Sequence, residues 1–332
     1  MTSQAYNAAR EVDIYAGVPF SNRNYIVDGN FDSWINSSTV LGVAGFNNNS
    51  ATMYYNYAGQ AGNATITRTS WPMGTEPVGM TSPTVNYLSH QQTVTSTGTV
   101  ANGLAPYMNG RVESVRTLSG RSATFSCWLW VASGTQTITN VLMRQGFGTG
   151  GSPSGTVIID PTVNWVVTTT PQRFSVRVDF PSVAGKTFGT DGKDCLYIGI
   201  WFPTTSGYTI NTSQWQLEAC SANAPAVGLP TAFEYRGAQA EIARIQRYFQ
   251  SGATGWEFPG PATGTYSCAQ WVTLPVIMRG APNIVMGTPS ENSVAGTISV
   301  GPVNAGSFRY FSNNAGSGTT LYTNSYTADA RL

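Results

Sequence analysis

Hydrophobic and polar positions alternate with a period of two along much of this chain, which is typical of β-strands with one buried face. Segment 122–132 is the clearest example, and segments 172–180 and 195–202 follow the same pattern. We expect the following side chains of these segments to face a core: Phe125, Cys127, Leu129, Val131, Phe174, Val176, Val178, Phe180, Leu196, Ile198, Ile200 and Phe202. Further strands are predicted over 64–69, 84–94, 112–118 and 214–219.

The period changes to that of a helix near residue 237. Ile242, Ile245 and Phe249 are spaced three and four apart, which places them on one face of a helix, and a Ser-Gly pair at 251–252 is a stop signal. We therefore predict a linking helix over 236–252. Its apolar face is a candidate oligomer interface; packing on its own domain is the alternative.

The regular set of alternating strands predicts a mainly all-β protein. Two antiparallel sheets packed on one core, in a jelly-roll, lectin-like sandwich, are expected over 25–235. Alternation after the helix predicts a small C-terminal β domain over 253–332. Residues 1–24 lack periodicity and are read either as an N-terminal docking arm or as a loose terminus.

Charge narrows the classes of function. Only 10% of the residues are charged and the formal net charge is +1, whereas ordinary soluble domains have about 25% charged residues. Nucleic-acid binding needs clustered Lys and Arg, so we expect none. No apolar run approaches the roughly 20 residues of a membrane span, and the first residues lack the apolar region of a secretory signal, so neither membrane insertion nor secretion is expected.

Metal and thiol chemistry have little support in the sequence. The chain has four cysteines and one histidine, with no C-x-x-C pair, which argues against a zinc site, and no cofactor is expected. Cys127 is expected to be a buried thiol, whereas Cys195 and Cys220 could pair or stay reduced; Cys268 is unassigned. His90 is expected to be a hydrogen-bonded surface residue, because it has no neighbouring nucleophile or second histidine.

Aromatic side chains supply the candidate binding site. Trp128 and Trp130 lie on the non-core face of one predicted strand, and Tyr197 and Trp201 lie on that of another. If the two strands share a sheet, the rings share one face, which would bind a sugar, meet another protomer or be covered by the other domain. The expected polar neighbours of this carbohydrate-binding face are Arg173, Arg177 and Gln216.

Five motifs carry a resemblance to a known family. They are, in order, NRNYIVDGNFDSW, GTGGSPSG, WFPTTSGYTINTSQWQLEA, AFEYRGAQAEIARIQRYFQ and the final YTADARL. Their order over residues 22–332 resembles the tail-fibre proteins of bacteriophages and prophages. The chain departs from that pattern after Trp34, where a Gln-Arg-Gly turn and an Ala-Asp-Arg-Trp strand are missing.

The resemblance implies a fibre or spike subunit that adheres to a bacterial surface polysaccharide. It implies a homotrimer on the exterior of the virion, assembled in the host cytoplasm and joined to other virion proteins through the N-terminal arm. The opening motif is also similar to that of carbohydrate-binding jelly rolls, some of which hold a structural calcium. The matching carboxylates are Asp28, Asp32 and Glu218, for which solvated side chains are the alternative.

Two other functions stay open. One is a head, neck or collar decoration protein with a purely structural role. The other is a glycan-degrading spike, which needs two carboxylates about 5 to 9.5 Å apart across the scissile bond. The sixteen acidic residues are mostly isolated in the sequence, and the Gly-rich segment 146–155 is expected to be a β loop rather than a phosphate loop. We therefore expect a binding protein rather than an enzyme.

Overall fold

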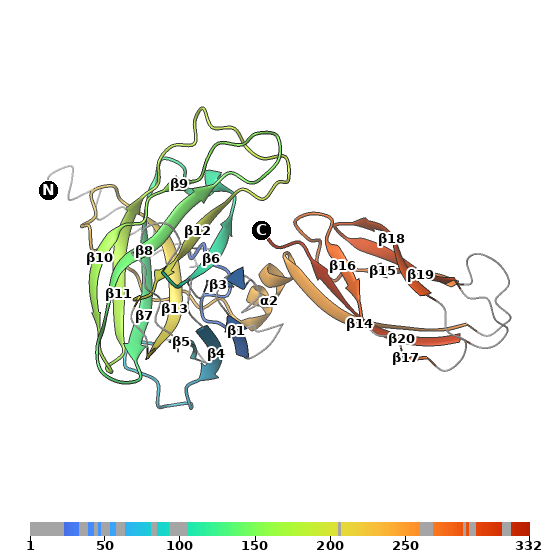
Figure 1. The fold of residues 1–332 in the computed structure, drawn as a ribbon, viewed down its shortest axis with the longest axis horizontal. Helices are drawn as coiled ribbons and strands as arrows, with labels where there is room; N and C mark the ends of the chain where they lie inside the picture. Colours follow the sequence, from blue (N-terminus) through green and yellow to red (C-terminus); the bar gives the residue numbers. More distant parts are fainter. Residues whose placement is uncertain are drawn as a thin grey trace, which may run out of the picture. The chain divides into compact units, whose positions relative to one another are not determined.

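The structure is a computed structural model. It describes the following residues: 23–32, 39–42, 46–47, 54–57, 64–80, 85–92, 105–204, 207–258, 268–287, 290–291, 297–313 and 320–332. The chain divides into two compact units, residues 1–237 and 238–332, each of which is considered by itself (Figure 1). The expected N-terminal arm lies almost entirely outside the described residues, which begin at Arg23.

The first unit is a sandwich of two antiparallel sheets (Figure 1). The first sheet contains, in spatial order, β1 (Thr39–Gly42), β4 (Ala64–Ser70), β5 (Asn86–Gln92), β13 (Tyr208–Cys220), β7 (Ser122–Val131) and β11 (Gln172–Asp179). The second sheet contains β10 (Thr162–Val167), β8 (Gln136–Gly146), β12 (Cys195–Trp201), β6 (Tyr107–Glu113), β3 (Tyr54–Tyr57) and β2 (Phe46–Asn47), with β9 (Val157–Ile158) beside β8. These sheets confirm the predicted all-β, jelly-roll type of fold.

The core of this unit lies between the two sheets. The predicted inward faces of segments 122–132, 172–180 and 195–202 all contribute to it, as does Trp215 of β13. The Trp215 ring meets Phe31 and Phe125 edge to face, which are favoured geometries for aromatic pairs. The turn predicted at Asp28 brings Phe31 into this position: Phe31 N donates to Asp28 O at 2.9 Å.

The cysteines of the first unit are thiols. Cys127 is buried in the core, as predicted, and burial raises the pKa of its thiol. Cys195 and Cys220 are also thiols, so the possible disulfide between them is not formed. The side chain of Cys268 lies outside the described part of the chain.

Two predictions in the first half of the chain are wrong. Segment 112–118 is not one strand: β6 ends at Glu113 and Val115–Leu118 forms a 3-10 helix. Ser114 has a φ of 62°, and the Asp194 carboxylate accepts hydrogen bonds from Ser114 Oγ and Val115 N at 3.0 and 3.1 Å, which turns the backbone out of the sheet. His90 is not on the surface but fully buried, and its ring stacks on Phe202.

The Gly-rich segment 146–155 forms the expected loop between β strands. With the loop that follows β11 it projects from one end of the sandwich, near β9 (Figure 1). The two loops are joined by Thr149 Oγ1, which donates to Asp191 Oδ2 at 2.7 Å, and by Gly189 N, which donates to Phe147 O at 2.6 Å.

The second unit also contains two antiparallel sheets. It begins with helix α2 (Ala238–Gln246). One sheet has β14 (Phe249–Phe258), β20 (Thr320–Asp329) and β16 (Asn283–Met286) in spatial order, with β17 (Ser290–Glu291) also paired to β20. The other has β15 (Cys268–Thr273), β19 (Ser307–Asn313) and β18 (Thr297–Asn304). A separate core includes Leu274, Met278, Phe308, Tyr310 and Tyr326.

The linking helix is shorter than predicted. It ends at Gln246, and Phe249 already pairs with Asp329 in the sheet of β14 and β20. The side-chain amide of Gln250 donates to the carbonyl of Gln246 at 2.9 Å and so satisfies one acceptor at the helix end. The apolar spacing therefore spans a helix followed by a strand. Among the described residues, no helix has the length and apolar character needed to cross a bilayer.

Candidate functional site

The four candidate rings do not share one face. Trp128 and Trp130 belong to β7 in the first sheet, whereas Tyr197 and Trp201 belong to β12 in the second sheet. Each pair points away from the core, as its alternation predicts, but the two outer faces lie on opposite sides of the sandwich. The condition for a single aromatic face, that the two strands share a sheet, is therefore not met; strand alternation alone does not show which strands pair.

The chain itself covers the first pair of rings. Trp128 and Trp130 are buried together with Met80 and Val85. Trp71, at the end of β4, packs on Trp130 with ring centres 5.6 Å apart. These two indoles are therefore core residues of a small second cluster and cannot stack on a sugar in this structure.

The three expected polar neighbours lie on the same outer face as these rings, and each forms hydrogen bonds with other residues of the chain. Arg173 pairs in register with Trp128 and donates from Nη2 to Ser126 Oγ at 2.9 Å. Arg177 donates to Ala222 O and to Asp179 Oδ2, both at 2.9 Å. Gln216 is fully buried, and its oxygen accepts from Glu234 N at 2.8 Å. Arg177 and Gln216 thus hold the segment after β13 against the first sheet, whereas Arg173 bonds to β7 within the sheet.

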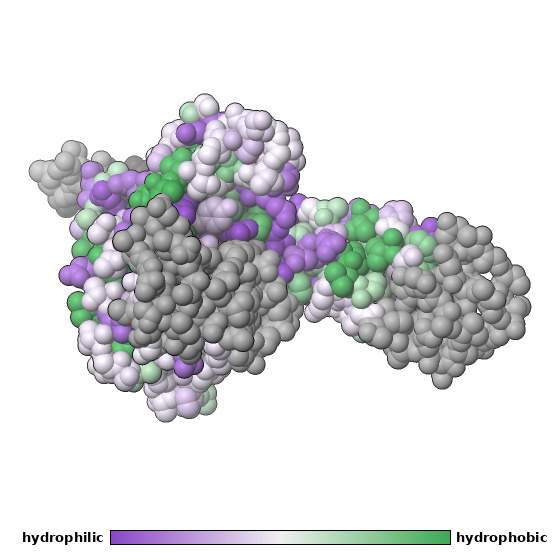
Figure 2. Space-filling view, in the orientation of Figure 1, coloured by the Kyte–Doolittle hydropathy of each residue, from purple (hydrophilic) through white to green (hydrophobic). Residues whose placement is uncertain are grey.

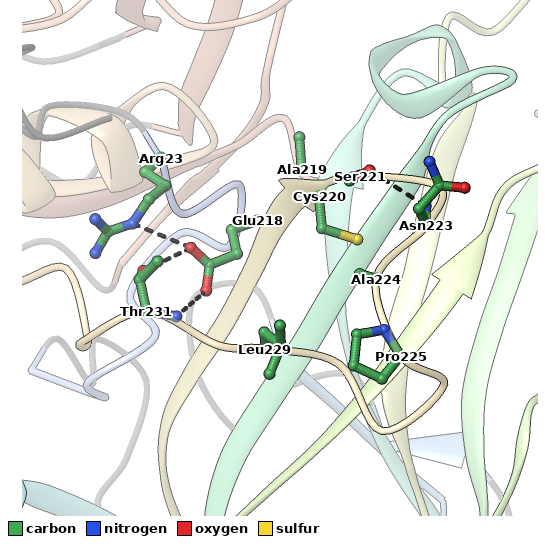
Figure 3. A pocket seen from close by; sticks show the side chains of 10 residues that line it. All are labelled: Arg23, Glu218, Ala219, Cys220, Ser221, Asn223, Ala224, Pro225, Leu229 and Thr231. Atoms are coloured by element: carbon green, nitrogen blue, oxygen red, sulfur yellow. Dashed lines mark hydrogen bonds and ion pairs between the residues drawn. The ribbon is translucent and has the colours of Figure 1, made fainter. Parts of the chain in front are cut away.

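A pocket of about 320 Å³ lies where this segment leaves β13 (Figure 3). Its lining residues are Arg23, Glu218, Ala219, Cys220, Ser221, Asn223, Ala224, Pro225, Leu229 and Thr231. Glu218 accepts from Thr231 N and Oγ1 at 2.8 and 2.6 Å and forms an ion pair with Arg23 Nε at 3.2 Å. Burial raises the pKa of the Cys220 thiol, which keeps it protonated and weakly nucleophilic. The polar groups of this pocket thus serve mainly to anchor the chain.

Two of the three possible calcium ligands, Glu218 and Asp32, already interact with other side chains of the protein. Glu218 is neutralised by Arg23, and Asp32 Oδ1 accepts from Asn30 Nδ2 and Asn86 Nδ2 at 2.9 and 2.6 Å. Asp28 is buried at the opening turn with a φ of 57°. Within the described ranges, no group of three or more His, Cys, Asp or Glu side chains is arranged to hold a metal ion.

The outer face of the second sheet carries a partly exposed aromatic group. β12 lies between β6 and β8, so Tyr197 is directly between Arg111 and Arg144. The Arg111 guanidinium carbon is 5.1 Å from the centre of the Tyr197 ring. Further along β12, Trp201 lies opposite Tyr107, and their rings meet edge to face at 4.9 Å. We call these five residues the Tyr197 face.

Glycines shape the Tyr197 face. Gly199 lies between Tyr197 and Trp201 on the same side of β12, and a Cβ there would overlap the backbone oxygen of Met108. A Cβ on Gly146 would lie 2.5 Å from the Tyr197 ring, so that ring rests directly on the β8 backbone. Burial raises the pKa of Tyr197 to about 12, so its hydroxyl stays protonated at neutral pH.

Asp160 fixes the floor of the Tyr197 face. Its Oδ2 accepts from Arg144 Nη2 at 2.7 Å and from Trp201 Nε1 at 3.2 Å. Its Oδ1 accepts from Met143 N at 2.8 Å. Because Trp201 is almost fully buried, the accessible part of this face consists of the half-buried side chains of Tyr107 and Tyr197 with Arg111 and Arg144 beside them.

Sequence reasoning missed four of the residues that build this face. Tyr107 and Arg111 alternate with buried Met108 and Val112, so a search for period-two patterns over 107–113 would have found them. Arg144 lies on β8, where apolar and polar residues do not alternate regularly. Asp160 has no local signal, because its role depends on a φ of 32° and on contacts with two other strands.

The candidate oligomer residues lie in different environments. Ile245 and Phe249 are buried within the second unit, and Ile242 is 45% exposed. The first two therefore pack on their own domain in this structure, which is the alternative that the sequence left open. Only Ile242 of these three offers a surface to another molecule.

Comparisons with known proteins add little about function. No protein-family profile and no curated protein sequence matches the chain. Among solved structures, one described as "CBM4 structure and function" matches with a TM-score of 0.34 and 13% identity, over 59% of this chain and 99% of that chain. A putative sugar-binding protein from Bacteroides thetaiotaomicron matches with a TM-score of 0.37 and 12% identity, over 59% of this chain and 100% of that chain.

A bacteriophage structure is also among the similar ones. The enzymatically active domain of tailspike protein 4 from bacteriophage CBA120 matches with a TM-score of 0.35 and 12% identity, over 60% of this chain. The match spans 22% of that chain. All of these similarities are too low to indicate a function for this protein.

Proposed function

We propose that this protein binds a carbohydrate on the Tyr197 face. The observation that supports this most is the position of Tyr197, a half-buried ring directly between Arg111 and Arg144. An aromatic ring stacks on the apolar face of a sugar, and guanidinium groups donate hydrogen bonds to its hydroxyls. Asp160 holds Arg144 in place, so part of the face is organised before a ligand arrives.

We also propose that the chain is a fibre or spike subunit on the exterior of a virion, which adheres to a host-surface polysaccharide. The five motifs and their order support this role. Several copies on one particle would strengthen a weak single site by multivalency, as in the expected homotrimer. The decoration role is the competing proposal and differs from adhesion in one way: it requires no binding to cells by the isolated protein.

Glycan cleavage is a weaker proposal for the same face. It requires a pair of carboxylates across the scissile bond. Asp160 is the carboxylate that the structure places there, and it is engaged by Arg144, Trp201 and Met143. Release of reducing ends from host capsule by the purified protein would support cleavage over binding.

The test is binding of the fluorescently labelled full chain to candidate host cells and to their extracted surface polysaccharides. Tyr197→Ala removes the ring, and we expect it to weaken glycan binding about tenfold or more, equivalent to roughly 1.4 kcal/mol. Tyr197→Phe is the matched control, because it keeps the ring and should retain most of the affinity. Circular dichroism would verify that both variants fold.

Two results would reject adhesion through this face. If the folded wild-type protein does not bind its own host or the extracted glycans, the decoration role becomes the better explanation. If it binds and Tyr197→Ala binds equally well, the glycan site lies elsewhere on the molecule.

A further inference from the structure

The second unit has an aromatic surface of its own, on the outer face of the sheet formed by β15, β19 and β18. Phe308 and Tyr310 of β19 point into the core, so Arg309 and Phe311, which alternate with them, lie on the outer face. Trp271 of β15 pairs in register with Arg309 and therefore lies beside it. Trp271 is 54% exposed, more than any other Trp side chain that the structure describes. A Trp at such exposure is unusual, because this large ring is mostly buried in folded proteins.

Arg309 gives this surface a positive charge. Its guanidinium carbon lies 5.7 Å from the centre of the Phe311 ring. No carboxylate pairs with it among the residues that the structure describes, whereas Arg331 of the same unit pairs with Asp329 at 2.6 Å. Among the described residues, the Arg309 guanidinium thus contacts a ring and no carboxylate, so a ligand could accept its hydrogen bonds.

The backbone around these side chains keeps the surface open. Gly301 of β18 lies next to Phe311, where a Cβ would be 3.1 Å from ring atom Cε1. Ala269 and Ser299 are the residues opposite Phe311 on the two neighbouring strands. Small side chains therefore surround the rings, and a flat ligand can approach them. Figure 2 shows hydrophobic and hydrophilic residues side by side over the described part of this unit.

We propose that Trp271, Arg309 and Phe311 form a second saccharide-binding surface, which takes an acidic sugar. The Trp271 ring would stack on the apolar face of the sugar, and the Arg309 fork matches the geometry of a carboxylate. A protein partner fits less well: a stable interface buries about 800 Å² on each side, and covering Arg309 without an acidic group is costly. This surface belongs to the second unit and does not depend on the Tyr197 face.

The experiment follows Trp271 itself by fluorine NMR of the full chain labelled with 5-fluorotryptophan. The Trp271 signal is assigned by its loss in Trp271→Phe. The probes are oligomers of galacturonic, mannuronic and sialic acid at millimolar concentration, and the matched uncharged probe is the methyl ester of the galacturonic acid oligomer. We expect a saturable shift of the Trp271 signal with at least one acidic probe and about tenfold weaker binding of the ester.

Arg309→Gln removes the charge and keeps a polar side chain. We expect it to reduce the affinity for the acidic probe about tenfold and to leave that for the ester unchanged, whereas Val285→Ala, at an exposed position on the other sheet, changes neither. The proposal is overturned if none of the acidic probes shifts the signal, or if acid and ester bind equally well. Tyr197→Ala separates the two sites: it should leave the Trp271 shift intact, whatever its effect on binding to cells.

Discussion

The single histidine, His90, links the stability of the folded protein to pH. His90 lies in the core of the sandwich, with its ring 3.9 Å from that of Phe202 and at 18° to it. Burial disfavours the charged imidazolium and lowers the pKa of His90 to about 3 from its ordinary value of 6.5. The His90 ring is therefore a neutral, stacked part of the packing between the two sheets.

This pKa predicts how stability changes with pH. The folded-state value lies below the unfolded one, so between about pH 6.5 and pH 3 the unfolded state binds the extra proton. The contribution of neutral His90 is complete above pH 6.5 and is lost as the pH falls towards 3. Between pH 7.5 and pH 5 we expect the first unit to lose about 2 kcal/mol more than a His90→Leu variant does. Urea unfolding at both pH values measures this; equal losses would show that His90 titrates normally in the folded state.

At the scale of elements, the segment between β4 and β5 determines which side chains on the outer face of the first sheet are buried. Trp71 packs on Trp130, and Gly79, with a φ of 97°, brings the backbone close to the Trp128 ring. A side chain at Gly79 would be strained by its φ and would lie 3.3 Å from the indole. The described part of this connection therefore covers the outer face of the first sheet.

Replacing the covered rings should affect stability and not binding. Trp130→Ala would leave a cavity beneath this cover, and we expect it to destabilise the first unit by about 3–5 kcal/mol. Met73, in the same connection, is 91% exposed, so Met73→Ala should change the free energy of unfolding by less than about 0.5 kcal/mol. Thermal unfolding and glycan binding are measured together: a folded, stable Trp130→Ala protein that fails to bind glycan would contradict this assignment.

At the scale of the whole molecule, the two units have separate cores. The core of the first unit contains Leu217, and that of the second contains Phe308, both fully buried. Each core joins strands of its own unit only, so each unit has the packing needed to unfold as a cooperative body.

Calorimetry of the full chain should therefore show two separable unfolding transitions. Phe308→Ala should lower the transition of the second unit by an amount that corresponds to about 3–5 kcal/mol, and Leu217→Ala should lower that of the first unit by about 2–5 kcal/mol. Each variant serves as the control for the other. A single transition that both variants shift equally would mean that the units unfold together.

The sequence by itself determined the class of the protein and the faces of its strongest strands. Side chains on a strand alternate between its two faces, so the core residues of β7, β11 and β12 could be read from spacing alone. The same local rule could not show that β7 and β12 lie in different sheets, because strand pairing joins segments far apart in the chain. For that reason the four rings that the sequence suggested for one face lie in two pairs on different sheets.

Tertiary contacts decided the rest. Phe249 has helical spacing from Ile245, but the helix ends at Gln246 and Phe249 belongs to a strand. It pairs there with Asp329, which lies about 80 residues later in the sequence. Asp160 carries no recognisable pattern, yet it holds Trp201 and Arg144 because the fold brings β8 and β12 to it. The periodicity of the sequence indicates which face of an element is buried. Long-range packing determines which elements meet, and therefore which polar and aromatic groups form a site, and local spacing does not encode that packing.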